Sequence, residues 1–129
     1  MDQKVAYWVR LSEYDLETAE AMLQTERFLY VGFMCHQAIE KIAKACYHMV
    51  IDQMPPKTHN IIFLLEQTKG TLSLTDEQKD FLEVLQPMNI EARYPDYQDR
   101  IFKSLNYEKC RELLRVTREM HLWIKEKLR

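Results

Sequence analysis

The segment from Phe28 to Ile51 constrains the fold most, because apolar or small residues occupy nearly the whole circumference of the helix it predicts. A helix that is apolar almost all round is buried by its neighbours. The polar exceptions are few, and their spacing of three or four residues places them in one stripe: His36, Gln37, Glu40, Lys41, Lys44 and His48. We therefore expect a buried central helix whose polar stripe faces solvent, a groove or another subunit.

The rest of the chain also favours helices, since only two glycines and four prolines interrupt it, too few for the turns of an all-β fold. Two further long helices are predicted, one over about residues 4–25 and one from the N-cap Asn106 to Leu128. A shorter helix is predicted from an N-cap at Thr58 to Gly70. Another begins at the capping-box pair Thr75 and Gln78, kinks or restarts at Pro87, and continues to Tyr94. Residues 96–104 have no clear period and are predicted as a loop. The predicted class is all-α, an up-and-down bundle of about five helices around residues 28–51, in a single domain over residues 1–129.

Charge and cysteine content limit the classes of function. The formal net charge is −2 and the pI is about 6.1, so a contact with phosphates needs a local basic patch. Cys35, Cys46 and Cys110 have no CxxC spacing and lie within apolar helical patterns, which is typical of reduced, buried thiols and favours the cytoplasm. We expect no membrane segment, no targeting segment and no cofactor.

Arg93 and Tyr94 stand where a predicted helix meets a polar segment. The planar guanidinium group of an arginine there suits bidentate contact with a phosphate or a carboxylate. The alternative is a structural ion pair with Glu40 or Asp99, which is the more common role of a charged residue.

The histidines suggest several roles. His36 and Glu40 are spaced to offer two metal ligands, but no second pair such as HxxxH or CxxC completes a site, so no metal is predicted. His59, at a predicted helix start, is either a neighbour of the cap or a proton acceptor. His121 lies between core positions of the last helix and is expected at the boundary of the core.

Three blocks, taken in order, resemble the HEPN family, and in particular its small stand-alone prokaryotic members. They are HQAIEK at residues 36–41 together with Lys44, Thr58-His59 ahead of a pair of leucines, and Ala92-Arg93-Tyr94-Pro95. An N-terminal AYWVRLSEYDLETAEAML segment precedes them and a long terminal helix follows, so the resemblance spans nearly the whole chain. It implies an up-and-down helical bundle that usually dimerises and has a role connected with nucleotides or RNA.

Many members of that family are metal-independent ribonucleases, often the toxin of a toxin–antitoxin pair whose partner is a small nucleotidyltransferase. In those ribonucleases an arginine is followed a few residues later by a histidine, and two such motifs meet across the dimer. Arg93 matches the arginine, whereas Gln98, Asp99 and Arg100 occupy the positions of the histidine. Cleavage through a 2′-hydroxyl needs a proton acceptor and a donor, which glutamine and arginine do not supply near neutral pH.

The favoured prediction is therefore a homodimer, without catalysis, that binds a nucleotide or docks a small nucleotidyltransferase in a toxin–antitoxin-like system. Its predicted ligand-binding residues are Arg93, Tyr94, His36, Glu40, Lys41 and Lys44. The alternative is a metal-independent RNase toxin with a degenerate motif, in which Arg93 stabilises phosphate charge and His59 or His36 transfers protons. A third possibility is that the stripe is only a dimer interface.

Overall fold

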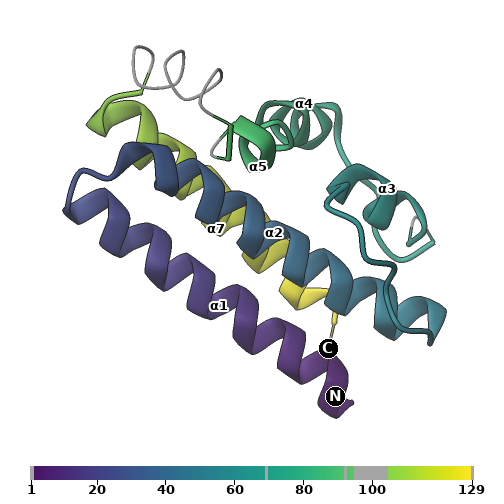
Figure 1. Ribbon diagram of the computed structural model, residues 1–129. Coiled ribbons are helices and arrows are strands. Elements are labelled where there is room, and N and C mark those ends of the chain that lie inside the picture. Colours follow the sequence, from purple (N-terminus) through teal and green to yellow (C-terminus); the bar gives the residue numbers. More distant parts are fainter. Residues whose placement is uncertain (1, 69, 92, 95–104, 129) are drawn as a thin grey trace.

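The computed structural model describes residues 2–68, 70–91, 93–94 and 105–128. Its helices, drawn in Figure 1, are α1 (Gln3–Gln24), α2 (Phe28–Ile51), α3 (Ile61–Glu66), α4 (Asp76–Leu85), α5 (Met88–Glu91) and α7 (Tyr107–Glu126). These described ranges contain no strand, so the predicted all-α class is confirmed.

The three long helices form the body of the bundle. α1 and α2 are antiparallel neighbours, and α7 packs against α2 from behind in the view of Figure 1. Because α3, α4 and α5 carry the chain back along the bundle, α7 runs parallel to α2. The core side chains of α2 are almost fully buried between these neighbours: Val31, Cys35, Ala38, Ile39, Ile42, Ala43, Ala45 and Cys46. The predicted bundle around a buried helix over residues 28–51 is confirmed.

The turn between α1 and α2 is fixed by backbone hydrogen bonds. The N–H of Arg27 donates to the carbonyl of Met22 at 2.7 Å, and the N–H of Glu26 donates to the carbonyl of Leu23 at 3.1 Å. These two bonds define a Schellman motif, which requires a left-handed residue after the helix. Glu26 takes that conformation with φ of 60° although it is not a glycine.

Two helix starts follow from local capping, as predicted. Thr75 and Gln78 make both hydrogen bonds of a capping box, and the side chain of Asn106 caps α7. Pro87 lies between the end of α4 and the start of α5, so the predicted restart of the helix there is also confirmed. The loop predicted for residues 96–104 lies outside the described residues.

The helix after α2 begins and ends at other residues than predicted. The N–H of Thr58 bonds to the carbonyl of Pro56 at 2.9 Å, so a turn occupies the predicted N-cap position. Asn60 caps α3 instead, and the hydroxyl of Thr58 accepts the N–H of Asn60 at 3.1 Å. α3 ends at Glu66, so Gly70 is not its C′ residue. The helix predicted to reach Tyr94 also ends early, since α5 stops at Glu91.

The three cysteines are buried, as predicted, and none is in a disulfide. Burial raises the pKa of Cys35 to about 12 and that of Cys110 to about 11, so both thiols stay protonated and unreactive near neutral pH. Within the described ranges, every helix is too short or too polar to cross a bilayer.

Candidate functional site

Glu40 is the centre of a polar network on α2. Its side chain is 4% exposed, and its two carboxylate oxygens accept from two different partners. Nδ1 of His59 lies 2.8 Å from Oε1, and Nζ of Lys44 lies 3.2 Å from Oε2. A buried carboxylate is stable only when such partners replace the lost water, and each of the two oxygens of Glu40 has one.

His59 is held by this carboxylate but remains accessible. Its side chain is 52% exposed and comes from the connection between α2 and α3, immediately before the N-cap Asn60. Because an ionised carboxylate only accepts hydrogen bonds, Nδ1 of His59 carries the proton in this contact. With that proton on Nδ1, an unprotonated Nε2 has an unshared pair, which is the arrangement of a general base oriented by a carboxylate.

His36 lies in the same row of α2 but is fully buried. Its Nδ1 is 3.9 Å from Oε1 of Glu40, too far for a hydrogen bond, and neither ring nitrogen has a hydrogen-bond partner. Burial is the main effect on its pKa and lowers it, while the nearby charge of Glu40 opposes this, so the ring is neutral near pH 7. The prediction that the stripe faces outward is therefore wrong for His36, which the bundle encloses.

Lys41 and Lys44 of the stripe also contact other side chains of the protein. Lys41 donates to the carboxylate of Asp15 at 2.5 Å, which joins α2 to α1 through a partly buried ion pair. Lys44 lies with Nζ 5.5 Å from the centre of the Trp8 ring, within cation–π distance. The predicted outward row is thus mostly covered by α1 and by the connection after α2. Trp8 and Asp15 were not predicted as parts of the site, since the sequence placed them only within the helix predicted over about residues 4–25.

Arg93 is exposed, and its guanidinium carbon lies 5.5 Å above the ring of Phe33 on α2. No carboxylate among the described residues forms an ion pair with it, and Glu40 is occupied by Lys44 and His59. The predicted alternative of a pair with Glu40 is therefore wrong, while Asp99 lies outside the described residues. Tyr94, which follows it, is 55% exposed.

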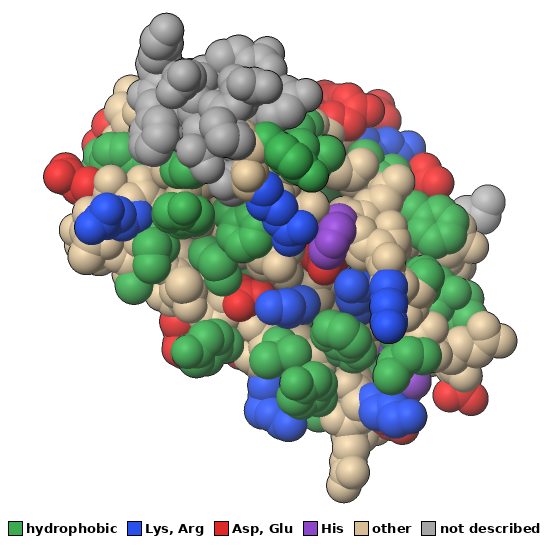
Figure 2. Space-filling view, in the orientation of Figure 1, with side chains coloured by type: hydrophobic (Ala, Val, Ile, Leu, Met, Phe, Trp, Pro, Cys, Tyr) green, Lys and Arg blue, Asp and Glu red, His purple; other side chains and the backbone are tan. Residues whose placement is uncertain are grey.

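Arg93 and His59 contact the same face of α2. Phe33, under Arg93, precedes Glu40 by seven residues, which is about two helical turns and about 10 Å along the axis. The structure thus places three predicted residues, Arg93, Lys44 and His59, along one side of the helix. Figure 2 shows this face, on which several Lys and Arg side chains lie beside and below a histidine, with an acidic side chain next to it and hydrophobic side chains among them.

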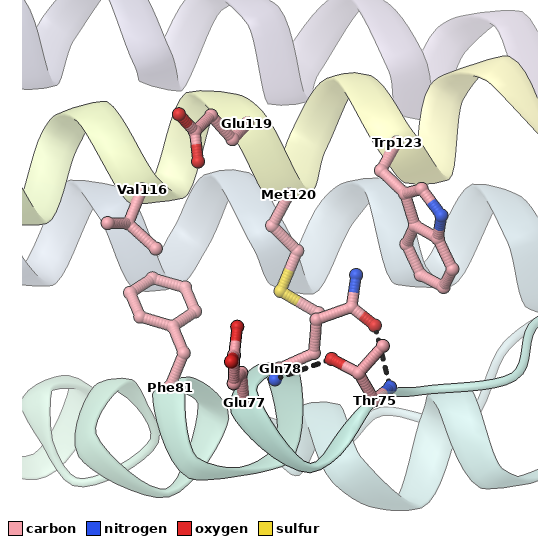
Figure 3. Close-up of a pocket in the computed structure, with 8 residues that line it drawn as sticks. All are labelled: Thr75, Glu77, Gln78, Phe81, Val116, Glu119, Met120 and Trp123. Carbon is pink, nitrogen blue, oxygen red and sulfur yellow. Dashed lines mark hydrogen bonds between the residues drawn. The ribbon is translucent and has the colours of Figure 1, made fainter.

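A hollow of about 290 Å³ between α4 and α7 has acidic and apolar residues in its lining, in contrast to the basic residues beside His59. In Figure 3 Glu77 comes from α4 and Glu119 from α7, on opposite sides of the hollow, and the walls include the apolar side chains of Phe81, Met120 and Trp123. Its described lining contains no lysine or arginine. Glu119 pairs with Arg115 of its own helix, and with no lysine or arginine in its described lining the hollow offers a phosphate no positive partner. Among the described residues there is also no group of three His, Cys, Asp or Glu side chains that could hold a metal ion.

Fold and site together define a class of protein: a small all-α domain whose central helix carries a carboxylate-bound histidine and an exposed arginine on one face. Residues 5–128 match the HEPN domain, and the chain belongs to the HEPN domain family. That membership supports a role connected with nucleotides or RNA. The crystal structure of TT1696 from Thermus thermophilus has a similar fold, with a TM-score of 0.83, 20% sequence identity, and coverage of 98% of this chain and 99% of that chain. A search of curated proteins gave no match.

Proposed function

We propose that this protein binds a nucleotide or RNA through the exposed side chains of Arg93, Tyr94 and His59, with the largely buried Lys44 beside them on the same side of α2. The observation that carries the proposal is the exposed guanidinium group of Arg93, which has no carboxylate partner among the described residues. A guanidinium group has the planar geometry for a bidentate phosphate contact. Glu40 orients His59 and Lys44, while the predicted contacts of Lys41 and His36 with a ligand are replaced by their contacts inside the chain.

Binding is tested by the fluorescence anisotropy of a labelled single-stranded RNA and of a labelled nucleotide. Arg93→Ala is expected to weaken binding about tenfold, and binding of the unaltered protein should fall as salt rises, because phosphate contacts release counterions. Arg111→Ala is the matched control, since Arg111 is an exposed arginine of α7 that pairs with Glu108 in its own helix. Equal binding by both variants and the unaltered protein would contradict the proposal.

The proposal includes a homodimer, a cytoplasmic location and a small nucleotidyltransferase as partner in a toxin–antitoxin-like system. Family membership supports the dimer and the partner, and the three buried thiols support the location. The mass in solution should be twice 15.6 kDa. Co-expression with a small nucleotidyltransferase from the same genome should yield a complex on purification, and separate elution of the two proteins would count against the partnership.

A second candidate function is metal-independent RNA cleavage, and the Glu40–His59 hydrogen bond favours it specifically. Nε2 of His59 would take the proton of a ribose 2′-hydroxyl, and the 2′-oxygen would attack the adjacent phosphorus as the bond to the 5′-oxygen breaks. The 5′-oxygen would then receive the proton from the imidazolium. Arg93 would stabilise the charge that develops on the phosphate oxygens.

Cleavage and binding are separated by substitutions at His59. His59→Ala is expected to abolish cleavage of a labelled RNA while leaving affinity within a few-fold, and a chelator should have no effect on the unaltered protein. Glu40→Gln, which removes the charge that orients His59, should reduce the rate by about tenfold or more. RNA that stays intact with the unaltered protein would eliminate this second function and leave the binding function in place.

A further inference from the structure

The side of α2 that carries Arg93, Lys44 and His59 is called the basic face below. A cavity of about 530 Å³ lies on α1, at the opposite end of this face from Arg93. Its lining includes the first turns of α1, with Lys4, Tyr7, Trp8 and Arg10, and Met54 from the connection after α2. Its volume falls within the range of about 300–1,000 Å³ that is usual for small-molecule sites. It differs from the hollow between α4 and α7 because its described lining carries two cations and no carboxylate.

The cavity presents flat aromatic surface to solvent. Tyr7 is 52% exposed, and its ring centre lies 6.3 Å from that of Trp8 at an interplanar angle of 62°. The guanidinium carbon of Arg10 lies 5.9 Å from the centre of the Tyr7 ring. An exposed aromatic face bordered by cations is the combination that binds unpaired bases, because the ring stacks on the base and the cation contacts its phosphate.

The cavity is connected to the His59 site through one side chain. Nζ of Lys44 contacts the carboxylate of Glu40 on one side and the ring of Trp8, which lines the cavity, on the other. A single strand that reaches His59 therefore has an aromatic surface within reach along the same face. Figure 2 shows hydrophobic side chains lying among the basic ones on this face.

We infer that this cavity binds an unpaired nucleobase of a single strand, with Tyr7 and Trp8 as the stacking surface and Lys4 and Arg10 as contacts for the flanking phosphates. The inference rests on the proposed function, because it assigns a base-binding position to the same ligand. An apolar peptide would be the other occupant of such a cavity, but two lining cations without a carboxylate favour a ligand that carries phosphates.

The test compares a short single-stranded RNA with an abasic ribose–phosphate strand of equal length. Tyr7→Ala is expected to weaken binding of the RNA about 5- to 160-fold, which is the effect of losing one stacking partner, and to leave binding of the abasic strand unchanged. Tyr14→Ala is the matched control, since Tyr14 is a more exposed tyrosine of the same helix that does not line the cavity. Thermal melting checks that both variants fold.

A second measurement reports directly on Trp8. The chain has two tryptophans, so Trp123→Phe leaves the fluorescence of Trp8 alone. The RNA should quench this fluorescence in a saturable manner, and the abasic strand should not. If RNA and abasic strand bind equally well and Tyr7→Ala changes neither, the base site is overturned while the proposed function stands. If neither strand binds, the base site and RNA binding by the protein are both overturned. If an apolar peptide, and not the RNA, changes the Trp8 fluorescence, the base site alone is overturned.

Discussion

Glu40 is a buried carboxylate that holds two neighbouring side chains by hydrogen bonds. Its side chain is almost inaccessible, yet it receives hydrogen bonds from a lysine of its own helix and from a histidine beyond the end of that helix. Removing its charge leaves Lys44, which is only 9% exposed, without an anionic partner. A buried charge that loses its partner destabilises the fold by more than the intact pair stabilises it. Substitution of Glu40 should therefore affect the free energy of unfolding strongly.

We predict that Glu40→Gln lowers the free energy of unfolding by about 2–3 kcal/mol, because Lys44 loses its ion pair in a poorly solvated position. Urea denaturation followed by circular dichroism measures the change. Glu112→Gln is the control, since Glu112 pairs with Arg115 on the exposed side of α7 and should leave the midpoint unchanged. Equal effects of the two substitutions would show that burial does not govern the contribution of Glu40.

The residues of this site could be found from the sequence one by one, but their contacts could not. Glu40, Lys44 and His59 were each singled out by pattern or by resemblance. The bond between Glu40 and His59 depends on how the turn at Thr58 directs the chain back over α2, which no helical period encodes. The burial of His36 was missed for a similar reason, since the helices that cover a polar row are fixed by the whole packing.

At the scale of elements, local chemistry was the most reliable guide. The capping box at Thr75 and the cap at Asn106 were predicted because each needs only residues within one turn. The N-cap predicted at Thr58 was wrong: threonine is a common N-cap residue, but Asn60, two residues later, caps α3 instead. Pro56 decides in favour of Asn60, because its carbonyl holds Thr58 in a turn.

The Schellman turn after α1 offers a prediction with a matched control. Glu26→Gly is expected to raise the free energy of unfolding by up to about 1 kcal/mol, because glycine adopts the left-handed conformation without a Cβ penalty. Glu17→Gly, in the exposed middle of α1, should lower it by about 0.5–1 kcal/mol. Thermal melting of the two variants measures both changes, and a loss of stability in Glu26→Gly would refute the argument.

The contact between α2 and α5 fixes the start of the segment that carries Arg93. A Cβ atom at Gly32 would lie 2.8 Å from Sδ of Met88, whose flexible side chain can move. Gly32→Ala is therefore expected to change stability by less than about 1 kcal/mol, since the gain in helix propensity offsets the shift of Met88. Gly32→Leu should displace α5 and weaken RNA binding together with stability. Binding by Gly32→Leu at the level of Gly32→Ala would show that this contact does not position Arg93.

At the scale of the whole molecule, the junction of α1 and α7 contains a buried histidine. His121 is 5% exposed rather than at the expected boundary of the core, and its Nε2 lies 2.8 Å from Oγ of Ser12. The hydroxyl of Ser12 donates to the carbonyl of Val9 at 2.6 Å, so Nε2 of His121 is the donor in their contact. Burial lowers the pKa of His121 to about 4, with the nearby charge of Glu13 acting in the opposite direction.

This lowered pKa makes the stability of the bundle dependent on pH. Between about pH 6.5 and pH 4 the unfolded chain binds a proton at His121 that the folded chain does not, so stability falls as the pH falls through this window. A shift of this size corresponds to about 3 kcal/mol at its limit, and the lowered pKa of buried His36 adds to it in the same direction. Urea midpoints at pH 7 and pH 4.5 measure the loss. His121→Gln can still donate to Ser12 but cannot titrate, so its midpoint should fall less than that of the unaltered protein, and an equal fall would mean that His121 is protonated in the folded bundle.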